Sequence, residues 1–258
     1  MGTVSFTIRT RSILPHQSNL EAVLNAISPG SGFRFAYGPR PNEMTATVPP
    51  RWAQDVARLL LLHQWPRVTA ITAADLTLAL DFYSLPPDRP GGDPGDGFQR
   101  TSTGERMNAA KYGGDQEALE ALITDAASLA ANHPLFRRAK AVMAVPGHLA
   151  GPGPVDGLPR RIAQRVARRL QTDDLSDRLQ RVRPVSEAKA RGEMPQAGTM
   201  EVFTGLRGEV LLVDDALGQG HTLAEACRAA RQAGAERVYS LVLAKDWTGT
   251  RGFRKEDL

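Results

Sequence analysis

Cysteine is almost absent from this chain: of its 258 residues only Cys227 is a cysteine. A disulfide scaffold and a cysteine-based metal cluster both need several cysteines, so both are excluded. A long apolar run is also missing: runs such as Leu59 to Leu62 are far shorter than the roughly 20 residues that span a bilayer. The first residues show no basic segment followed by an apolar one, as a secretory signal would. We therefore expect a cytoplasmic protein without a membrane partner.

The chain also lacks a strong excess of charge of either sign. Its net charge is +4, with 41% hydrophobic and 23% charged residues, which is ordinary for a globular protein. At this length the chain can bury a substantial core and form one large domain or two small ones. The small positive excess is compatible with a surface that attracts anions, with a phosphate-rich ligand and with nucleic acid, and composition alone leaves all three open.

A strand, a glycine-bearing loop and a helix follow one another between residues 209 and 234. The apolar residues 210–213 predict a buried strand, which the paired carboxylates of Asp214 and Asp215 are expected to end. A polar loop comes next, and from Thr222 onward small and apolar residues recur at helical spacing. The dinucleotide fingerprint fails because GQGHTLAE lacks its third glycine, and the Gly-Lys-Ser/Thr of a Walker loop is missing.

This strand, loop and helix together suit a sugar phosphate. The backbone N–H groups of a glycine-bearing loop at a helix N-terminus converge on one point, where the helix dipole adds positive charge and a phosphate can bind. Two carboxylates would repel that phosphate, but they can accept hydrogen bonds from neighbouring ribose hydroxyls while a divalent cation offsets their charge. The alternative interpretation is a generic turn of an open α/β fold.

The same residues resemble the phosphoribosyl-pyrophosphate (PRPP) signature of the type I phosphoribosyltransferases, in which four apolar and two acidic residues precede a loop rich in Thr and Gly. The resemblance implies that Asp214 and Asp215 are catalytic residues that contact the ribose hydroxyls and reach Mg²⁺ indirectly, through ribose or water. It also implies that the loop holds the 5-phosphate, with contacts from Ala216, Gly218, Gln219, Gly220, His221 and Thr222. At Gly218 and Gln219 the family commonly has Ser or Thr, so side-chain hydroxyls are missing there while the main-chain donors remain.

Two further segments resemble the ComF-like members of that family. Residues 110–114 are similar to a Lys-Tyr-x-Gly segment upstream of the core, and Val145-Pro146 matches the start of a Val-Pro-x-Pro loop. The resemblance then implies pyrophosphate contacts from the loop that follows, namely Pro146, Gly147 and His148, where His148 replaces the second proline.

The resemblance also assigns roles by position alone. Lys189 and Arg191 lie where the family has a mobile loop that brings a basic side chain to the pyrophosphate, so they become catalytic candidates. Trp247 follows the last predicted strand and becomes a candidate contact of the acceptor. A basic loop without this role and an indole that closes the end of the sheet are the respective alternatives.

The order of the elements predicts an α/β fold: a doubly wound, mainly parallel sheet in residues 101–258, preceded by a small N-terminal α/β domain in residues 1–84. Residues 85–100, rich in Pro and Gly, are expected to be a linker. The expected strands are 4–8, 33–37, 44–48, 76–82, 139–145, 210–213 and 238–243, and the expected helices are 20–27, 51–63, 115–129, 160–170 and 222–233.

We therefore expect a Mg²⁺-dependent phosphoribosyltransferase that transfers ribose 5-phosphate from PRPP to a small nitrogen acceptor and releases pyrophosphate. A non-catalytic sensor of PRPP or a nucleotide is the second hypothesis, motivated by the missing loop hydroxyls. ComF-like DNA handling is the third, and nucleic-acid contact is the lesser interpretation of the arginines in 160–170 because aromatic residues do not alternate with them. A homodimer is among the expectations, because members of the family often self-associate.

Overall fold

The computed structural model describes residues 4–9, 34–37, 43–54, 68–70, 72–85, 99–147, 157–183 and 198–246. Its main sheet has six strands in the order β4-β5-β13-β12-β8-β9. Neighbouring strands are parallel except β4 and β5, which are antiparallel. The strands are β4 (Val68–Ala70), β5 (Leu76–Phe82), β8 (Ala141–Ala144), β9 (Asp173–Asp174), β12 (Glu209–Leu217) and β13 (Arg237–Lys245). The predicted α/β class with a mainly parallel sheet is confirmed.

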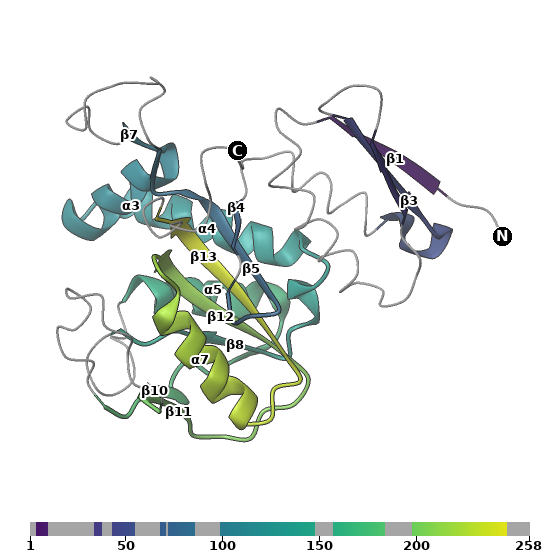
Figure 1. The fold of residues 1–258 in the computed structure, drawn as a ribbon. Helices are drawn as coiled ribbons and strands as arrows, with labels where there is room; N and C mark the ends of the chain where they lie inside the picture. Colours follow the sequence, from purple (N-terminus) through teal and green to yellow (C-terminus); the bar gives the residue numbers. More distant parts are fainter. Residues whose placement is uncertain are drawn as a thin grey trace.

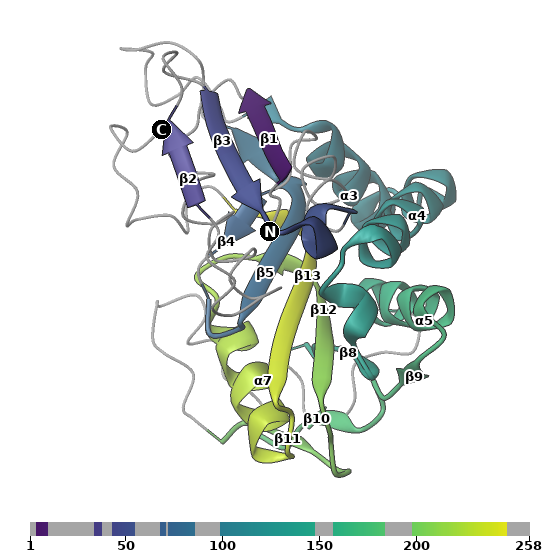
Figure 2. The same cartoon turned by 90° about the vertical axis from the view of Figure 1, so that its right-hand side faces the viewer.

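Helices cover both faces of the main sheet (Figure 1, Figure 2). One face carries α3 (Ser102–Tyr112), α4 (Gln116–Asn132) and α5 (Leu158–Leu170), and the other carries α7 (His221–Gln232). The helices expected at 115–129, 160–170 and 222–233 are thus confirmed. Asp115 caps α4 by accepting a hydrogen bond from the N–H of Ala118 (3.0 Å), and α5 ends at Gln171, whose φ of 56° is left-handed. None of the described helices is long and apolar enough to cross a membrane.

The central strands are buried on both faces, and this explains their continuous apolar sequence. In β12 the side chains of Leu211 and Val213 join the cluster under α4 and α5, whereas Val210 and Leu212 join the cluster under α7. Successive residues of a strand point to opposite faces, so a strand between two helical layers needs apolar residues at every position. The burial of this strand confirms the prediction made from residues 210–213.

Among the described residues, three small antiparallel sheets accompany the main one. The first has the order β1-β3-β2, formed by β1 (Val4–Arg9), β2 (Arg34–Tyr37) and β3 (Glu43–Val48), which confirms the strands expected near the N-terminus. The other two are the pairs β6 (Ser84–Leu85) with β7 (Gln99–Arg100) and β10 (Leu179–Arg181) with β11 (Met200–Val202). Two 3-10 turns are η1 (Pro50–Trp52) and η2 (Phe136–Arg138). The helix expected at 20–27 and most of that expected at 51–63 lie outside the described residues.

The position of strand β5 differs from the domain boundary that the sequence predicts. It was expected to end a separate domain of residues 1–84, but it pairs with β13 inside the main sheet, so this sheet continues across the expected boundary. The large residues Leu76, Leu78 and Leu80 alternate with the small Thr77 and Ala79, which in sequence indicates a half-buried strand. All five are buried, because α7 covers the second face. The residues of the expected linker that the structure describes, 85 and 99–100, lie in β6 and β7.

Candidate functional site

Two predicted motifs meet at the carboxyl ends of the neighbouring strands β8 and β12. Ala144 lies opposite Val213, and the N–H of Val145 donates to the carbonyl of Val213 at 2.8 Å. The chain leaves β8 through α5 on one face of the sheet and leaves β12 through α7 on the other. Neighbouring strands whose connections leave to opposite faces are the place where an open α/β sheet binds ligands. Pro146 and Gly147 therefore lie beside Asp214 and Asp215 at the edge best suited to a ligand.

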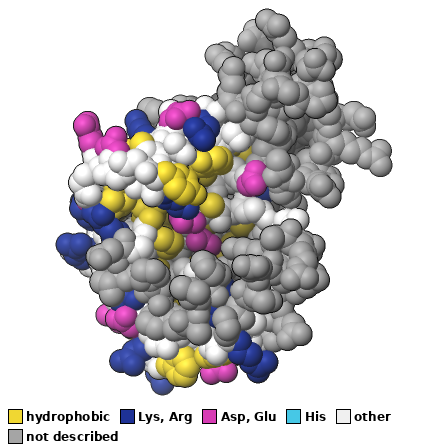
Figure 3. All heavy atoms as spheres, turned by 90° about the vertical axis from the view of Figure 1, so that its left-hand side faces the viewer, with side chains coloured by type: hydrophobic (Ala, Val, Ile, Leu, Met, Phe, Trp, Pro, Cys, Tyr) yellow, Lys and Arg dark blue, Asp and Glu magenta, His cyan; other side chains and the backbone are white. Residues whose placement is uncertain are grey.

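Figure 3 shows the face of the molecule toward which the strand ends point. Acidic side chains lie near its centre, next to a basic one, with hydrophobic side chains above them. The strand β12 is longer than predicted: it includes Asp214, Asp215 and Ala216 and ends only at Leu217. The strand continues because Ala216 and Leu217 pair with Ala244 and Lys245 of β13. The sequence of β12 alone does not show how far its partner strand extends. The prediction that the acidic pair ends the strand is wrong.

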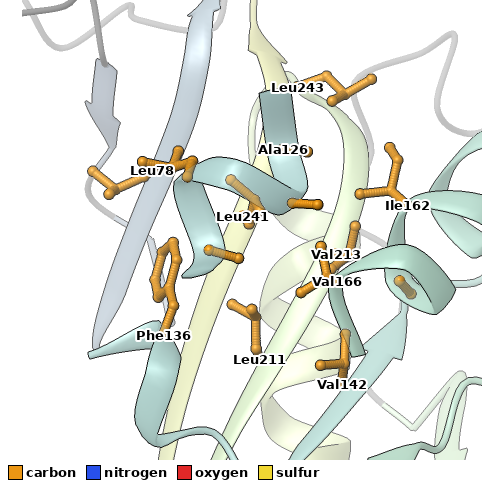
Figure 4. Packing of buried hydrophobic residues seen from close by; sticks show 14 of the residues in the cluster. Leu78, Ala126, Phe136, Val142, Ile162, Val166, Leu211, Val213, Leu241 and Leu243 are labelled. Atoms are coloured by element: carbon orange, nitrogen blue, oxygen red, sulfur yellow. The ribbon is translucent and has the colours of Figure 1, made fainter. Parts of the chain in front are cut away.

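The two carboxylates consequently point to opposite faces of the sheet. Asp215 lies on the face of Leu211 and Val213, which Figure 4 shows together with Ile162 and Val166 of α5. There its Oδ2 forms an ion pair with Nζ of Lys111, a residue of α3, at a distance of 2.6 Å. Asp214 lies on the opposite face, and its Oδ1 accepts a hydrogen bond from the N–H of Asp215 (2.8 Å), beyond the point where β8 has ended. Each carboxylate therefore has surroundings of its own.

Arg181, at the end of β10, is the basic residue on the Asp214 face. It is buried, its Nε donates to the carbonyl of Gly147 at 2.5 Å, and its Nη1 donates to Thr199 Oγ1 at 3.1 Å. Burial lowers the pKa of Arg181, an effect that the carboxylates of Glu225 and Asp214 oppose. Arg181 thus fixes the loop after β8 and adds a positive charge beside Asp214.

The predicted phosphate loop is shorter than the sequence indicates. It consists of Gly218, Gln219 and Gly220, because Ala216 belongs to β12 and both His221 and Thr222 belong to the first turn of α7. Gly220 has a φ of 83°, which glycine adopts without strain, and without a side chain it cannot cap the helix. Gln219 Oε1 instead lies 3.0 Å from His221 Nε2. The first-turn N–H groups of α7 therefore point out of the sheet edge as donors for an anion.

A second donor lies at the start of α5, which follows β8 at the same edge. The Arg160 side chain is only 9% exposed, and its Nη2 forms an ion pair with Asp177 Oδ1 at 2.5 Å. Its Nε and Nη1 are buried and have no hydrogen-bond partner among the described residues. A buried guanidinium nitrogen without an acceptor is costly, so an anion that reached Arg160 would satisfy it.

The remaining predicted residues fall into two groups. Pro146 and Gly147 follow β8 after one residue, Val145, and Pro146 is buried while Gly147 is exposed. The other four, His148, Lys189, Arg191 and Trp247, lie outside the described residues. No motif in the sequence assigns a role to Lys111, Arg160 or Arg181. Lys111 stood in the Lys-Tyr-x-Gly segment and Arg160 at the start of a predicted helix, but pairing with distant carboxylates has no local signal.

The described side chains at this edge form no direct site for Mg²⁺. Among these residues no group of three or more His, Cys, Asp and Glu could hold a metal ion. The two aspartates diverge, and Lys111 already contacts one of them. A magnesium ion at this edge would therefore take most of its oxygen ligands from water and from a bound phosphate compound, as this ion commonly does.

The chain matches no model of a known protein family, and no curated protein is significantly similar to it.

Proposed function

We propose that this chain is a phosphoribosyltransferase of the type I, ComF-like kind, which transfers ribose 5-phosphate from PRPP to a small nitrogen acceptor. The observation that carries the proposal is that Pro146-Gly147, just after β8, meet Asp214-Asp215 at the carboxyl ends of the neighbouring strands β8 and β12. These are the two segments to which the motif resemblance assigns the pyrophosphate and the ribose. They lie far apart in sequence, and the sheet order required to bring them together was not part of the motif match.

The parts of PRPP find complementary groups at this edge. The 5-phosphate fits the donors of Gly218–Gly220 and the first turn of α7. The ribose hydroxyls fit the carboxylates of Asp214 and Asp215, which accept hydrogen bonds. The pyrophosphate fits the loop after β8, with Arg160 as a source of two unpaired donors on the same side. Lys189, Arg191 and His148 stay candidates for this group, and Trp247 stays a candidate for the acceptor.

The reaction that follows needs positioning more than side-chain chemistry. A bond forms from the acceptor nitrogen to ribose C1 while the bond from C1 to the pyrophosphate oxygen breaks, and the oxygen keeps the electron pair. Asp214 and Asp215 stabilise the positive charge that develops on the ribose, and Arg160 stabilises the charge on the departing group. When bound, Mg²⁺ would neutralise part of the pyrophosphate charge.

The first experiment is calorimetric titration of the protein with PRPP, with and without Mg²⁺. We expect micromolar binding that requires Mg²⁺ and is lost in the double variant Asp214→Asn plus Asp215→Asn, which should also release no pyrophosphate. The double variant Asp173→Asn plus Glu236→Gln is the control, because it removes two exposed carboxylates at the amino ends of β9 and β13, away from the carboxyl edge. If the folded Asp214/Asp215 double variant still released pyrophosphate, the proposed phosphoribosyltransferase activity of this site would be refuted.

A non-catalytic PRPP sensor is the second candidate. It is favoured by Gly218 and Gln219, which stand in place of hydroxyl residues, and by the contact that Gln219 makes with His221. PRPP binding without pyrophosphate release across a panel of bases would select the sensor. The DNA hypothesis loses two arginines of α5, because Arg161 and Arg165 both form ion pairs with Glu120 of α4, at 2.9 and 3.0 Å, whereas Arg168 and Arg169 are exposed.

A further inference from the structure

Lys245 is a buried lysine at the carboxyl edge of the sheet to which the proposed reaction gives no role. It is the last residue of β13, and it lies in register with Leu217, which ends β12 just before the glycine turn. Only 8% of the residue is exposed. Alternation along β13 places Lys245 on the face of Leu241 and Leu243 (Figure 4), which is also the face of Asp215.

The ammonium group of Lys245 has no bonded partner among the described residues. Neither a hydrogen bond nor an ion pair with any of them reaches its Nζ. Burial lowers the pKa of Lys245, and the charge of the neighbouring Asp246 offsets only part of this effect. Withdrawing a charge from water without pairing it is costly, and buried lysines are therefore rare unless they are paired. The folded protein thus holds at its ligand edge an ammonium group that an anion would stabilise.

The order of the strands divides this edge between the two partners of the proposed reaction. The loop after β8, assigned to the pyrophosphate, lies on one side of β12, and the end of β13 lies on the other side (Figure 2). The acceptor nitrogen must approach ribose C1 from the side opposite to the departing oxygen, because the bond that forms and the bond that breaks lie in line. With the ribose at Asp214 and Asp215, the acceptor therefore enters beside Lys245.

We propose that Lys245 binds the acceptor, and that the acceptor carries a carboxylate or another anionic oxygen near its reacting nitrogen. A lysine side chain only donates hydrogen bonds, so it selects an oxygen over an amino group at this position. An anionic oxygen also supplies the charge that the buried ammonium lacks, whereas a neutral acceptor leaves that ammonium uncompensated. The substrate class rests on the proposed transferase function, but the anion site at Lys245 does not.

The test compares pairs of nitrogen compounds in which one member is a carboxylate: uracil with orotate, aniline with anthranilate, and nicotinamide with nicotinate. Calorimetry measures their binding with and without PRPP, and a pyrophosphate assay measures turnover with PRPP and Mg²⁺. In at least one pair, wild type should bind the carboxylate about tenfold or more tightly than its neutral counterpart. Wild type should also release pyrophosphate faster with that carboxylate.

Variants of Lys245 test whether this residue causes the preference. Lys245→Met and the more polar Lys245→Gln remove the charge, so the preference should disappear while the affinity for PRPP stays unchanged. Lys245→Arg should keep the preference, because a guanidinium group also pairs with a carboxylate. Lys140→Met, which removes an exposed lysine just before β8, is the matched control and should behave as wild type.

Three results would overturn the proposal: no preference for a carboxylate in wild type, a preference that survives in folded Lys245→Met and Lys245→Gln, or weaker PRPP binding by these variants. The first needs no variant, so a folding failure leaves the proposal open to refutation. The third would assign Lys245 to the phosphate groups of PRPP instead. If the carboxylates bind through Lys245 but PRPP does not bind wild type with Mg²⁺, the transferase function fails and the anion site stands.

Discussion

Arg181 shows at the scale of one residue how the carboxyl edge is held together. Its guanidinium joins the loop after β8, through Gly147, to the start of β11, through Thr199. The charge is buried, so it depends on these acceptors and on the carboxylates of Asp214 and Glu225 for the stabilisation that water would otherwise supply. One side chain therefore supports both the expected pyrophosphate loop and one carboxylate of the acidic pair.

Arg181→Met should lower the free energy of unfolding by about 2 to 4 kcal/mol, because it leaves buried acceptors and carboxylates without their cation. Urea unfolding at neutral pH measures this. The neighbouring Arg178 is exposed, so Arg178→Met should change stability by less than about 0.5 kcal/mol. Equal effects of the two substitutions would mean that the buried contacts of Arg181 contribute nothing.

Gly104 gives a second prediction for a single residue. In Gly104→Ala the new methyl group would meet the carbonyl oxygen of Tyr83, so α3 must shift away from β5 at a cost of about 1 to 3 kcal/mol. Gly205→Ala is the matched control: its Cβ would have no neighbour within 4 Å, and stability should stay within about 0.5 kcal/mol of wild type. Thermal melts of the two variants measure this difference. Equal melting temperatures for Gly104→Ala and Gly205→Ala would contradict the close contact between Gly104 and the Tyr83 carbonyl.

Whole helices and strands differ in how well the sequence predicts them. Helices α4, α5 and α7 bury one apolar face at helical spacing, and strands β8, β12 and β13 are continuous apolar runs buried on both faces, so their sequences predict them. Helix α3 is missed because only Gly104 and Met107 in it are buried. The acidic pair and the glycine loop are local and could be predicted, but the opposite directions of Asp214 and Asp215 depend on how far β12 pairs with β13. The ion pair from Lys111 depends on the docking of α3.

The contact between α7 and β11 depends on one buried carboxylate. Glu225 Oε1 accepts from the N–H of Met200 at 3.0 Å and from Arg228 Nη2 at 2.7 Å, and the same Nη2 donates to the carbonyl of Met200 at 2.7 Å. Burial by itself raises the pKa of Glu225, but the hydrogen bonds from Arg228 and Met200 outweigh it, so the net pKa is lowered. The ionised form is therefore the one that holds the two elements together.

Glu225→Gln should lower the free energy of unfolding by about 1 to 3 kcal/mol at neutral pH, because it replaces charge-assisted hydrogen bonds with weaker ones. A lowered pKa stabilises the fold above the unfolded-state pKa, and this contribution is lost as the pH falls through the folded-state pKa. The difference between wild type and variant should thus be flat between about pH 6 and 8 and shrink below about pH 4. Urea unfolding across this pH range measures the difference in free energy of unfolding between wild type and Glu225→Gln. If that difference grew toward low pH, Glu225 would not be ionised in the folded protein.

At the scale of the whole molecule, the site is a product of the sheet order. Strands β8 and β12 lie at the point where the connections part to opposite faces, so the carboxyl edge is built from the loop after β8, the turn before α7 and the end of α3. The helical layers on both faces of the sheet bury the strands that carry these segments. Unfolding of either layer would therefore disperse the site, which ties binding to the stability of the entire core.

Cys227 offers a measure of that stability. It is the only cysteine of the chain, it is 0% exposed on the inner side of α7, and burial raises the pKa of its thiol to about 12. Only an exposed thiolate reacts with a disulfide reagent, so labelling of the native protein requires α7 to leave the sheet. If α7 leaves only when the whole core unfolds, the logarithm of the labelling rate should rise with urea as steeply as global unfolding does. Gly104→Ala on the opposite face should then accelerate labelling about tenfold for each 1.4 kcal/mol of stability that it removes. Labelling that is fast in native buffer and indifferent to Gly104→Ala would show instead that α7, with the turn at Gly218–Gly220, opens as a separate unit.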